Sequence, residues 1–440
     1  MAKKTTNIFS DPNSVFSGLN AAFTQKSLMP VVTSDRSAML GIPVPSLALQ
    51  YLLGTTKIPF SRMVQIVGSE GSYKSTFMYE MLSWYIAQGG YAVIIETEAK
   101  DSGDTRNAVL NWDIEKLNRV AAVSVTDSTA WMSAVTATLL HYKDAMTKAH
   151  SYVPIFVGLD SVTATASSAS MASIDKEGYA SGSFPTLARD LSEYFKVMPS
   201  RVHNLPFTFS WINHVKPGTD SSMYSRGKIP GGKALAYYNS LTLHLGKKKT
   251  TESASGTVTS TLELSTWKNS WGRDGRKIDV DVVWYHSDND AMPIRCMFDW
   301  GTADIKFLLK LCDGTDCGAA TRDKIKSIID LRPCKVGVKP GVYSQVLGID
   351  KEDPKTYSEA GAILATKAEL LQQIQEALYI KQIPGFNAGD DYLQALEAAR
   401  NSNHDMIKNR GFGVKPEEDN SEEPVVIDEP VEEEDITDEQ

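Results

Sequence analysis

The stretch "VQIVGSEGSYKSTF", residues 64–77, combines a short apolar run, a loop with two glycines, and a lysine followed by a serine. Its spacing follows the phosphate-loop pattern G-x-x-x-x-G-K-[ST], except that Tyr73 stands where the pattern has its second glycine. In such a loop, backbone N–H groups at the start of a helix surround a phosphate, aided by the helix dipole. A chance strand–turn–helix is the alternative that this pattern alone leaves open. The predicted ATP-binding residues are Gly68, Ser69, Glu70, Gly71, Ser72, Tyr73, Lys74, Ser75 and Thr76.

The lysine and serine that close this loop predict the chemistry of a nucleoside triphosphate bound together with magnesium. Lys74 would neutralise the β- and γ-phosphates, and the Ser75 hydroxyl would bind Mg²⁺. A second metal ligand is predicted at Asp160, which ends the apolar run "VPIFVGLD". A carboxylate at the end of a parallel strand can hold Mg²⁺ directly or through water, although an aspartate that only caps a strand would give the same pattern. ATP and Mg²⁺ are therefore the predicted cofactors.

Further polar side chains follow two other predicted strands. The run "YAVIIETE" ends in Glu96 and Glu98, and alternation along a strand would let both carboxylates face the site. One of them could orient a water for attack on the γ-phosphate, while plain surface charge at a strand end is the alternative. The run "PFTFSWINH" ends in Asn213 and His214, where a side chain could contact the same phosphate.

A long loop with basic residues follows that strand, from about Val215 to Gly232. Cations suit the phosphates of single-stranded nucleic acid, and an aromatic ring suits base stacking. The loop is therefore a candidate DNA-binding segment, although an ordinary surface loop is equally compatible with its composition. The predicted DNA-binding residues within it are Lys216, Tyr224, Arg226 and Lys228.

Strands and helices must alternate along the chain to position these motifs. Apolar runs typical of buried strands occupy residues 63–68, 91–98, 153–160 and 206–214, and helical periodicity occupies residues 76–90, 130–150 and 184–202. This alternation predicts right-handed crossovers and a parallel sheet. Strand-like segments without intervening helices, at 241–249, 255–267 and 277–286, predict antiparallel strands that finish the sheet. The expected fold class is α/β with a mixed, mostly parallel central sheet.

Composition and charge exclude some classes of protein. Apolar residues make up 42% and charged residues 22% of the chain, which are ordinary values for a globular protein. We find no run of about 18 apolar residues and no secretory signal, so we expect no membrane partner. The four cysteines lack metal-ligand spacing and are expected to be reduced thiols, which favours a cytoplasmic location.

The net charge of −9 comes from the end of the chain. Residues 417–440 contain 13 acidic residues and no Lys or Arg, whereas the rest of the chain carries 45 basic and 41 acidic residues. A mildly basic body thus carries an acidic tail. The tail is either a solvated, disordered end or a mimic of nucleic-acid phosphates that competes for a basic surface.

Taken together, these motifs resemble those of the RecA-type recombinases, and most closely the bacteriophage UvsX-like branch. The resemblance covers about residues 35–300. The segment "VQIVGSEGSYKS" resembles the UvsX phosphate loop, where a bulky aromatic also precedes the lysine, and "ETE", "VGLDS" and "INH" resemble the strand ends of the family. The resemblance implies that Glu98, rather than Glu96, is the catalytic carboxylate. It also implies that His214 is a catalytic residue that senses the γ-phosphate.

The resemblance also implies residues that meet DNA or a second subunit. The helix "TLARDLSEYFKVM" resembles the one that follows the family's first DNA-binding loop, which places DNA-binding residues at Arg189 and Lys196. The segment "STWKNSWG" resembles the one whose basic residues reach the ATP of the neighbouring subunit, which makes Lys268 a catalytic residue supplied in trans. Ser270 occupies the next basic position of that segment and departs from the family pattern.

What the family implies is a DNA-dependent ATPase that forms a helical filament on single-stranded DNA. Such a protein pairs the bound strand with homologous duplex DNA and exchanges strands, in recombination, repair and recombination-dependent replication. The implied partners are single-stranded and duplex DNA, further copies of the chain, a single-stranded-DNA-binding protein and a loading mediator. The implied location is the cytoplasm of a host cell if the chain is phage-encoded.

The expected organisation has four parts. These are an N-terminal segment over 1–35, as a candidate filament-interface arm, a RecA-like P-loop ATPase core over 36–304, a small, mainly helical C-terminal domain over 305–415, and an acidic disordered tail over 416–440. Two alternatives remain: a hexameric DNA helicase with the same core fold, and a catalytically weak, filament-forming paralogue that binds DNA. Tyr73 and Ser270 keep the second alternative open.

Overall fold

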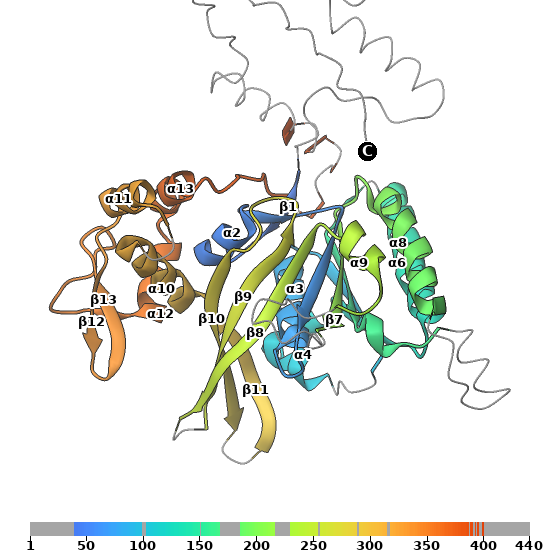
Figure 1. Cartoon of the computed structure of the whole chain (residues 1–440), viewed down its shortest axis with the longest axis horizontal. Helices are drawn as coiled ribbons and strands as arrows, with labels where there is room; N and C mark the ends of the chain where they lie inside the picture. The colour runs from blue at the N-terminus through green and yellow to red at the C-terminus, as the bar shows by residue number, and fades with distance from the viewer. Residues whose placement is uncertain are drawn as a thin grey trace, which may run out of the picture. The chain divides into compact units, whose positions relative to one another are not determined.

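The computed structural model describes residues 39–98, 103–149, 151–167, 185–215, 229–253, 256–287, 290–314 and 317–386, with a few single residues up to 399. A nine-stranded sheet in the order β11-β10-β9-β8-β3-β7-β6-β4-β5 forms the centre of this part of the chain (Figure 1). Its strands are β3 (Arg62–Gly68), β4 (Tyr91–Glu96), β5 (Val120–Ser124), β6 (Ile155–Asp160), β7 (Phe207–His214), β8 (Leu241–Glu252), β9 (Val258–Asn269), β10 (Lys277–Ser287) and β11 (Asp290–Asp299). The predicted α/β fold is confirmed.

The sheet is parallel on one side and antiparallel on the other. Strands β8, β3, β7, β6, β4 and β5 are parallel to one another, and β8, β9, β10 and β11 pair in antiparallel fashion. The register aligns Gly68 with His214 and Glu96 with Asp160. Because parallel strands end at the same edge of a sheet, this register collects the predicted polar residues there.

Helices cover both faces of the parallel strands. On one face, α3 (Lys74–Ala87) buries Phe77 and Tyr85 against strand residues such as Phe156. On the other face, α6 (Ser128–Ala149) and α8 (Pro185–Val202) lie side by side (Figure 1). Phe195 of α8 packs on Trp211 of β7, and Trp131 of α6 packs on Phe195. Each face therefore has its own apolar core, which fixes the sheet between two helical layers. Shorter helices in the same region are α2 (Leu47–Leu53), α4 (Asp104–Val109), α5 (Ile114–Leu117), α9 (Lys233–Tyr238) and the 3-10 turn η2 (Val162–Ala164), and β1 (Gly41–Pro43) pairs with β2 (Lys57–Pro59).

The chain after the sheet contains more than the helices that its pattern predicted. The helices are α10 (Trp300–Asp313), α11 (Ala319–Ile328), α12 (Tyr357–Ala365) and α13 (Ala368–Ala377). A small antiparallel sheet made of β12 (Arg332–Val336), β13 (Lys339–Tyr343) and β14 (Lys355–Thr356) lies between them and was not predicted. The proposed segments 1–35 and 416–440 lie outside the described residues.

A buried aspartate joins α10 to the beginning of α2. Asp304 Oδ1 accepts hydrogen bonds from Ser46 Oγ at 2.5 Å and from the Ala48 backbone N–H at 2.8 Å. Burial raises the pKa of Asp304 to about 6, although these donors favour the charged form. The contact spans more than 250 residues of sequence, so it ties α10 to the segment where α2 begins.

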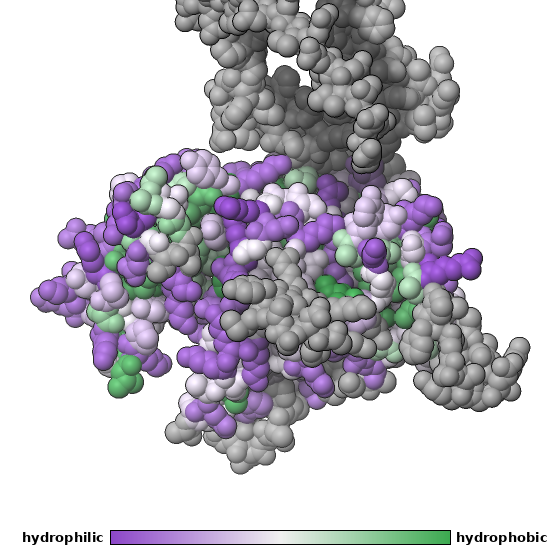
Figure 2. Space-filling view, in the orientation of Figure 1, coloured by the Kyte–Doolittle hydropathy of each residue, from purple (hydrophilic) through white to green (hydrophobic). Residues whose placement is uncertain are grey.

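The surface of the described residues is mainly hydrophilic on the face that Figure 2 shows, with apolar side chains in small separate areas. Within the described residues, every helix is too short or too polar to cross a membrane.

Candidate nucleotide-binding site

The phosphate loop has the geometry that its sequence predicts. It follows β3 and leads directly into α3, and Gly71 in its middle has a left-handed backbone with φ of 68°. Ser72 Oγ and Lys74 Nζ both donate to the Ser69 carbonyl oxygen, at 2.8 Å and 2.6 Å. Gly68 admits no larger residue, because a Cβ there would collide with Ser72 Oγ and the Leu245 carbonyl oxygen. The loop is therefore held in a closed curve at the N-terminus of α3, as phosphate binding requires.

Tyr73 explains why the consensus has glycine before the lysine. Its backbone is left-handed, with φ of 64° and ψ of 28°. This conformation suits glycine and costs other L-residues about 1 kcal/mol or more. The chain therefore keeps the backbone of a phosphate loop with a residue that adopts it less readily.

The side chain of Tyr73 makes contacts that glycine could not make. Its hydroxyl lies 2.7 Å from Ser260 Oγ on β9, and its ring centroid is 6.3 Å from that of Trp284 on β10. The ammonium of Lys247 on β8 lies over the same ring, 5.6 Å from its centroid. The ring thus points away from the loop and fills the space between α3 and the antiparallel strands.

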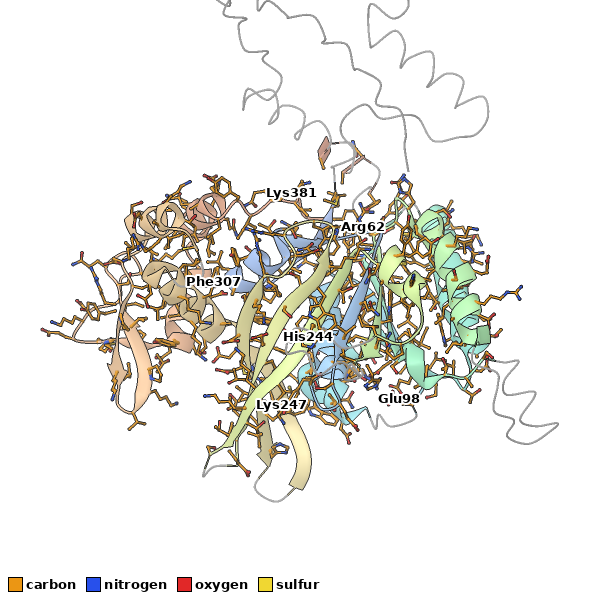
Figure 3. The ribbon with its side chains drawn as sticks, in the orientation of Figure 1. Arg62, Glu98, His244, Lys247, Phe307 and Lys381 are labelled. Carbon is orange, nitrogen blue, oxygen red and sulfur yellow. The ribbon has the colours of Figure 1, made fainter. Side chains whose placement is uncertain are left out.

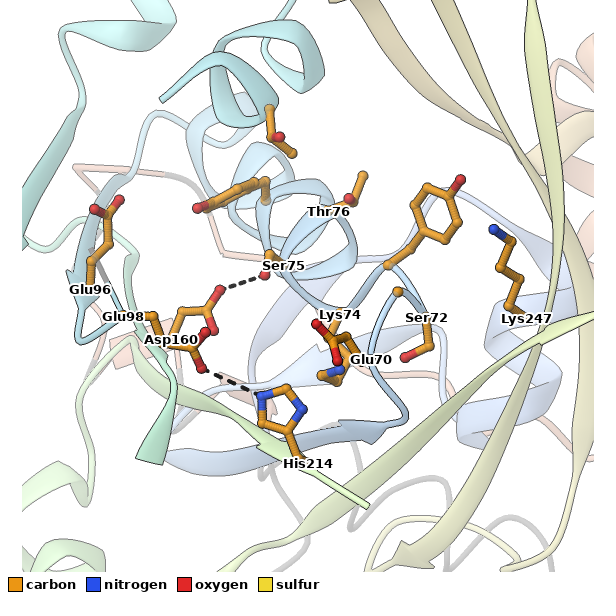
Figure 4. A pocket seen from close by; sticks show the side chains of 14 residues that line it. Glu70, Ser72, Lys74, Ser75, Thr76, Glu96, Glu98, Asp160, His214 and Lys247 are labelled. Atoms are coloured by element: carbon orange, nitrogen blue, oxygen red, sulfur yellow. Dashed lines mark hydrogen bonds and ion pairs between the residues drawn. The ribbon is translucent and has the colours of Figure 1, made fainter. Parts of the chain in front are cut away.

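The two predicted metal ligands face each other across the site. Ser75 Oγ donates to Asp160 Oδ2 at 2.5 Å (Figure 4). Burial raises the pKa of Asp160, the Glu98 carboxylate acts in the same direction, and the Ser75 hydrogen bond acts against both. Burial also lowers the pKa of Lys74, which is only 6% exposed, while the nearby carboxylates oppose that shift. A bound cation would relieve the cost of burying Asp160, so the pair fits a magnesium ion that completes its shell with phosphate oxygens and water.

Glu98 is held by residues from two neighbouring strand ends. Ser161 Oγ donates to Glu98 Oε1 at 2.9 Å, and His214 Nε2 lies 3.4 Å from the same oxygen (Figure 4). The Ser161 backbone N–H donates to Thr97 Oγ1 at 2.8 Å, which fastens the ends of β4 and β6 together. Glu98 is therefore positioned beside the predicted metal ligands, whereas Glu96 lies 3.7 Å from the Arg106 guanidinium.

These residues surround one cavity of about 520 Å³, a size typical of small-ligand sites. The cavity brings together most of the residues predicted from the sequence, including the phosphate loop, Glu98, Asp160 and His214. It also has lining residues that the sequence reading did not propose, namely Tyr79, Thr105 and Lys247. No local motif marks these three residues, because they come from a helix face, a short helix and an antiparallel strand.

Other predicted residues lie elsewhere. Lys268 does not line the cavity in this chain; its Nζ donates to the carbonyl oxygens of Ala236 and Tyr237 at the end of α9, at 2.9 Å each. Arg189 and Lys196 are exposed and two helical turns apart on α8. The residues predicted to bind DNA in the loop after β7 lie outside the described residues, and so does most of the predicted first DNA-binding loop, about residues 166–182. Those loop residues are Lys216, Tyr224, Arg226 and Lys228.

A phosphate loop between a central parallel strand and a helix, with a carboxylate at a neighbouring strand end, defines a P-loop nucleotide-binding protein. The model of the RecA N-terminal domain matches residues 13–287 of the sequence, so the chain belongs to the RecA family.

Known RecA proteins are distant relatives of this chain. The sequence is 26% identical to RecA from Symbiobacterium thermophilum over 244 residues, which is 55% of this chain and 64% of that protein. It is also 26% identical to RecA from Frankia alni over 267 residues (60% and 72%) and to RecA from Nocardia farcinica over 265 residues (60% and 71%). The alignment thus covers less than two thirds of the Symbiobacterium protein and a little over half of this chain.

Proposed function

We propose that the protein is an ATP-dependent DNA recombinase, which forms a filament on single-stranded DNA and exchanges strands with homologous duplex DNA. The observation that carries this proposal is the link between the nucleotide cavity and the candidate DNA-binding loop. His214 contacts Glu98 in the cavity, and the loop begins two residues later, at Lys216. Asn213 Nδ2 donates to the Pro230 carbonyl oxygen at 2.9 Å, so β7 is also bonded to the far end of the same loop.

The side chains around the cavity have distinct roles in this proposal. ATP would provide the phosphoanhydride bond that is cleaved. Ser75 and Asp160 would hold the Mg²⁺ that balances the charge of its phosphates. Lys74 would neutralise phosphate charge, and Glu98 would orient and deprotonate the attacking water. His214 would respond to the γ-phosphate through its contact with Glu98, and it would pass that response to the loop through β7.

The finer parts of the proposal come from the family resemblance. Lys268 would act on the nucleotide of a neighbouring subunit, and it would then have to leave the carbonyl oxygens at the end of α9. Arg189 and Lys196 would contact DNA together with the loop residues. Assignment to the phage UvsX-like branch, action in the cytoplasm of a host cell, and help from a single-stranded-DNA-binding protein and a loading mediator also belong to this proposal.

The first test is the effect of DNA on ATP hydrolysis. We expect single-stranded DNA to raise the hydrolysis rate about fivefold or more, because a coupling of about 1–3 kcal/mol between two sites corresponds to a factor of about 5–150. Phosphate release should be measured without DNA, with single-stranded DNA, and with blunt duplex DNA of equal length as the control. Equal rates in all three conditions would contradict a DNA-coupled ATPase and favour the catalytically weak paralogue.

Electron microscopy with an ATP analogue and single-stranded DNA separates the recombinase from the helicase. Helical filaments are the expected result. Closed six-membered rings would instead identify the chain as a hexameric helicase with the same core fold.

A further inference from the structure

The nucleotide cavity contains a second lysine that no phosphate-loop motif predicts. Lys247 lies on β8, far from the loop in sequence, yet it lines the cavity with Tyr73 and Thr76. In Figure 3, Lys247 and Glu98 lie towards the end of the sheet opposite Arg62, where β3 begins. In Figure 4, Lys247 and Glu98 lie on opposite sides of the cavity, with Lys74 between them.

The register of β8 explains why this lysine faces the cavity. Lys247 pairs with Leu262 of β9, and Leu262 is fully buried in the core that also contains α3. Directly paired residues share a face of a sheet, so the Lys247 side chain leaves on the α3 side. A register shift between Lys247 and Lys249 follows at once. The next residue, Lys248, binds Asp279 at 2.6 Å and Glu263 at 3.2 Å.

The charges around the cavity give Lys247 a role in nucleotide binding. Four carboxylates line the cavity, from Glu70, Glu96, Glu98 and Asp160, and two lysines, Lys74 and Lys247, face them. Within the described residues, no carboxylate lies within ion-pair distance of Lys247, unlike Lys248. The carboxylates repel the phosphates of a nucleotide, so each lysine that lines the cavity should contribute to nucleotide binding.

We propose that Lys247 binds the nucleotide phosphates from within the same chain, and that Tyr73 is the positioning residue that holds it there. The ring attracts the ammonium through a cation–π contact at 5.6 Å and is itself fixed by Ser260 and Trp284. Because Lys247 lies away from Glu98, it would contact the phosphates that ATP and ADP share, and not the γ-phosphate. The aromatic residue in the loop would thus bring a second cation to the site. This inference rests on the proposed function, since it assumes that the cavity binds ATP.

Calorimetric titration with the non-hydrolysable analogue AMP-PNP and with ADP, each with Mg²⁺, tests the role of Lys247. Lys247→Met should weaken binding of both nucleotides about fivefold or more, because one charge-assisted contact is lost. Lys247→Arg should restore most of the affinity. Lys249→Met is the matched control, since Lys249 is exposed on the same strand and does not line the cavity; its affinities should stay within about twofold of the wild type.

A double-variant cycle tests the role of Tyr73. Tyr73→Leu should weaken both nucleotides about as much as Lys247→Met, and the double variant should be no weaker than either single variant by more than about twofold. Tyr73→Phe keeps the ring but loses the hydrogen bond to Ser260, so it should recover most of the affinity that Tyr73→Leu loses. Thermal unfolding of each variant confirms that it is folded.

Four results would overturn the inference or part of it. If Lys247→Met bound both nucleotides normally, the inference would fail and the proposed function would stand. The same holds if Lys247→Met bound AMP-PNP more weakly but ADP normally. Losses that multiply in the double variant would refute the positioning role of Tyr73. If the wild-type chain bound neither nucleotide, the proposed function would fail together with the inference.

Discussion

Changing Glu98 to glutamine is expected to lower DNA-stimulated ATP hydrolysis by at least about 100-fold, the usual contribution of a positioned general base. The amide has the same shape, but it cannot take a proton from water. It can still accept a hydrogen bond from Ser161 Oγ, which now lies 2.9 Å from the carboxylate, so the strand ends should remain in place. ATP binding should therefore stay within a few-fold of the wild type. Phosphate release with saturating single-stranded DNA and a separate nucleotide titration measure the two effects.

Glu96→Gln is the matched control for this change. Glu96 lines the same cavity and ends β4, two residues before Glu98, but it lies beside Arg106, 3.7 Å from its guanidinium. Ser161 and His214 contact Glu98 instead. Its substitution should lower the rate by less than about tenfold. Equal losses for both variants, or more than a tenth of the wild-type rate in Glu98→Gln, would show that Glu98 is not the general base.

The sequence predicted those site residues that directly follow a strand, because a strand can be recognised from its own short apolar run. Gly68, Asp160 and His214 each follow an apolar run, and such runs predict parallel strands whose carboxyl ends meet at one edge. The observed register of β3, β4, β6 and β7 brings them together for that reason. Strand order was not needed for this step, because all carboxyl ends of a parallel sheet lie on the same side.

The surroundings of Tyr73 could not be predicted in this way. Its partners Ser260 and Trp284 are about 190 and 210 residues away and belong to antiparallel strands. The face of the sheet on which the Lys247 side chain lies depends on the irregular register between β8 and β9. A register shift of one residue moves a side chain to the other face. A run of three consecutive lysines gives no sign of which one faces α3.

Edge strands escaped prediction for a related reason. Strands β5 and β11 end the sheet on its two sides. Most of β5 is exposed, so it lacks the apolar run of a central strand, and Pro293 interrupts the pattern of β11. Proline is tolerated at a sheet edge, where one side of the ladder has no partner. The small sheet of β12, β13 and β14 has the same character, since its strands have few buried residues.

Changing Asp304 to alanine is expected to lower the free energy of unfolding by about 3 kcal/mol, because buried donors are left without an acceptor. The substitution removes the partner of Ser46 Oγ and of the Ala48 N–H at the start of α2. Equilibrium unfolding in urea measures the loss. Asp299→Ala is the matched control: Asp299 caps α10 through the Thr302 N–H at 2.9 Å but is only half-buried, so its loss should cost about 1 kcal/mol. Equal costs for the two variants would show that the Asp304 contact acts only as an ordinary helix cap.

The raised pKa of Asp304 also predicts a pH dependence of stability with a definite sign. Burial raises the pKa to about 6 in the folded chain, whereas an unfolded aspartate titrates near about 3.9. The folded state therefore binds the proton more tightly, and the contribution of Asp304 to stability falls as the pH rises from about 4 to about 6. Between about pH 7 and about pH 5, the wild type should gain about 1 kcal/mol of unfolding free energy relative to Asp304→Asn, which cannot titrate. Unfolding free energies that change in parallel for the two chains would mean that Asp304 stays ionised throughout this range, with the donors at the start of α2 outweighing the cost of burial.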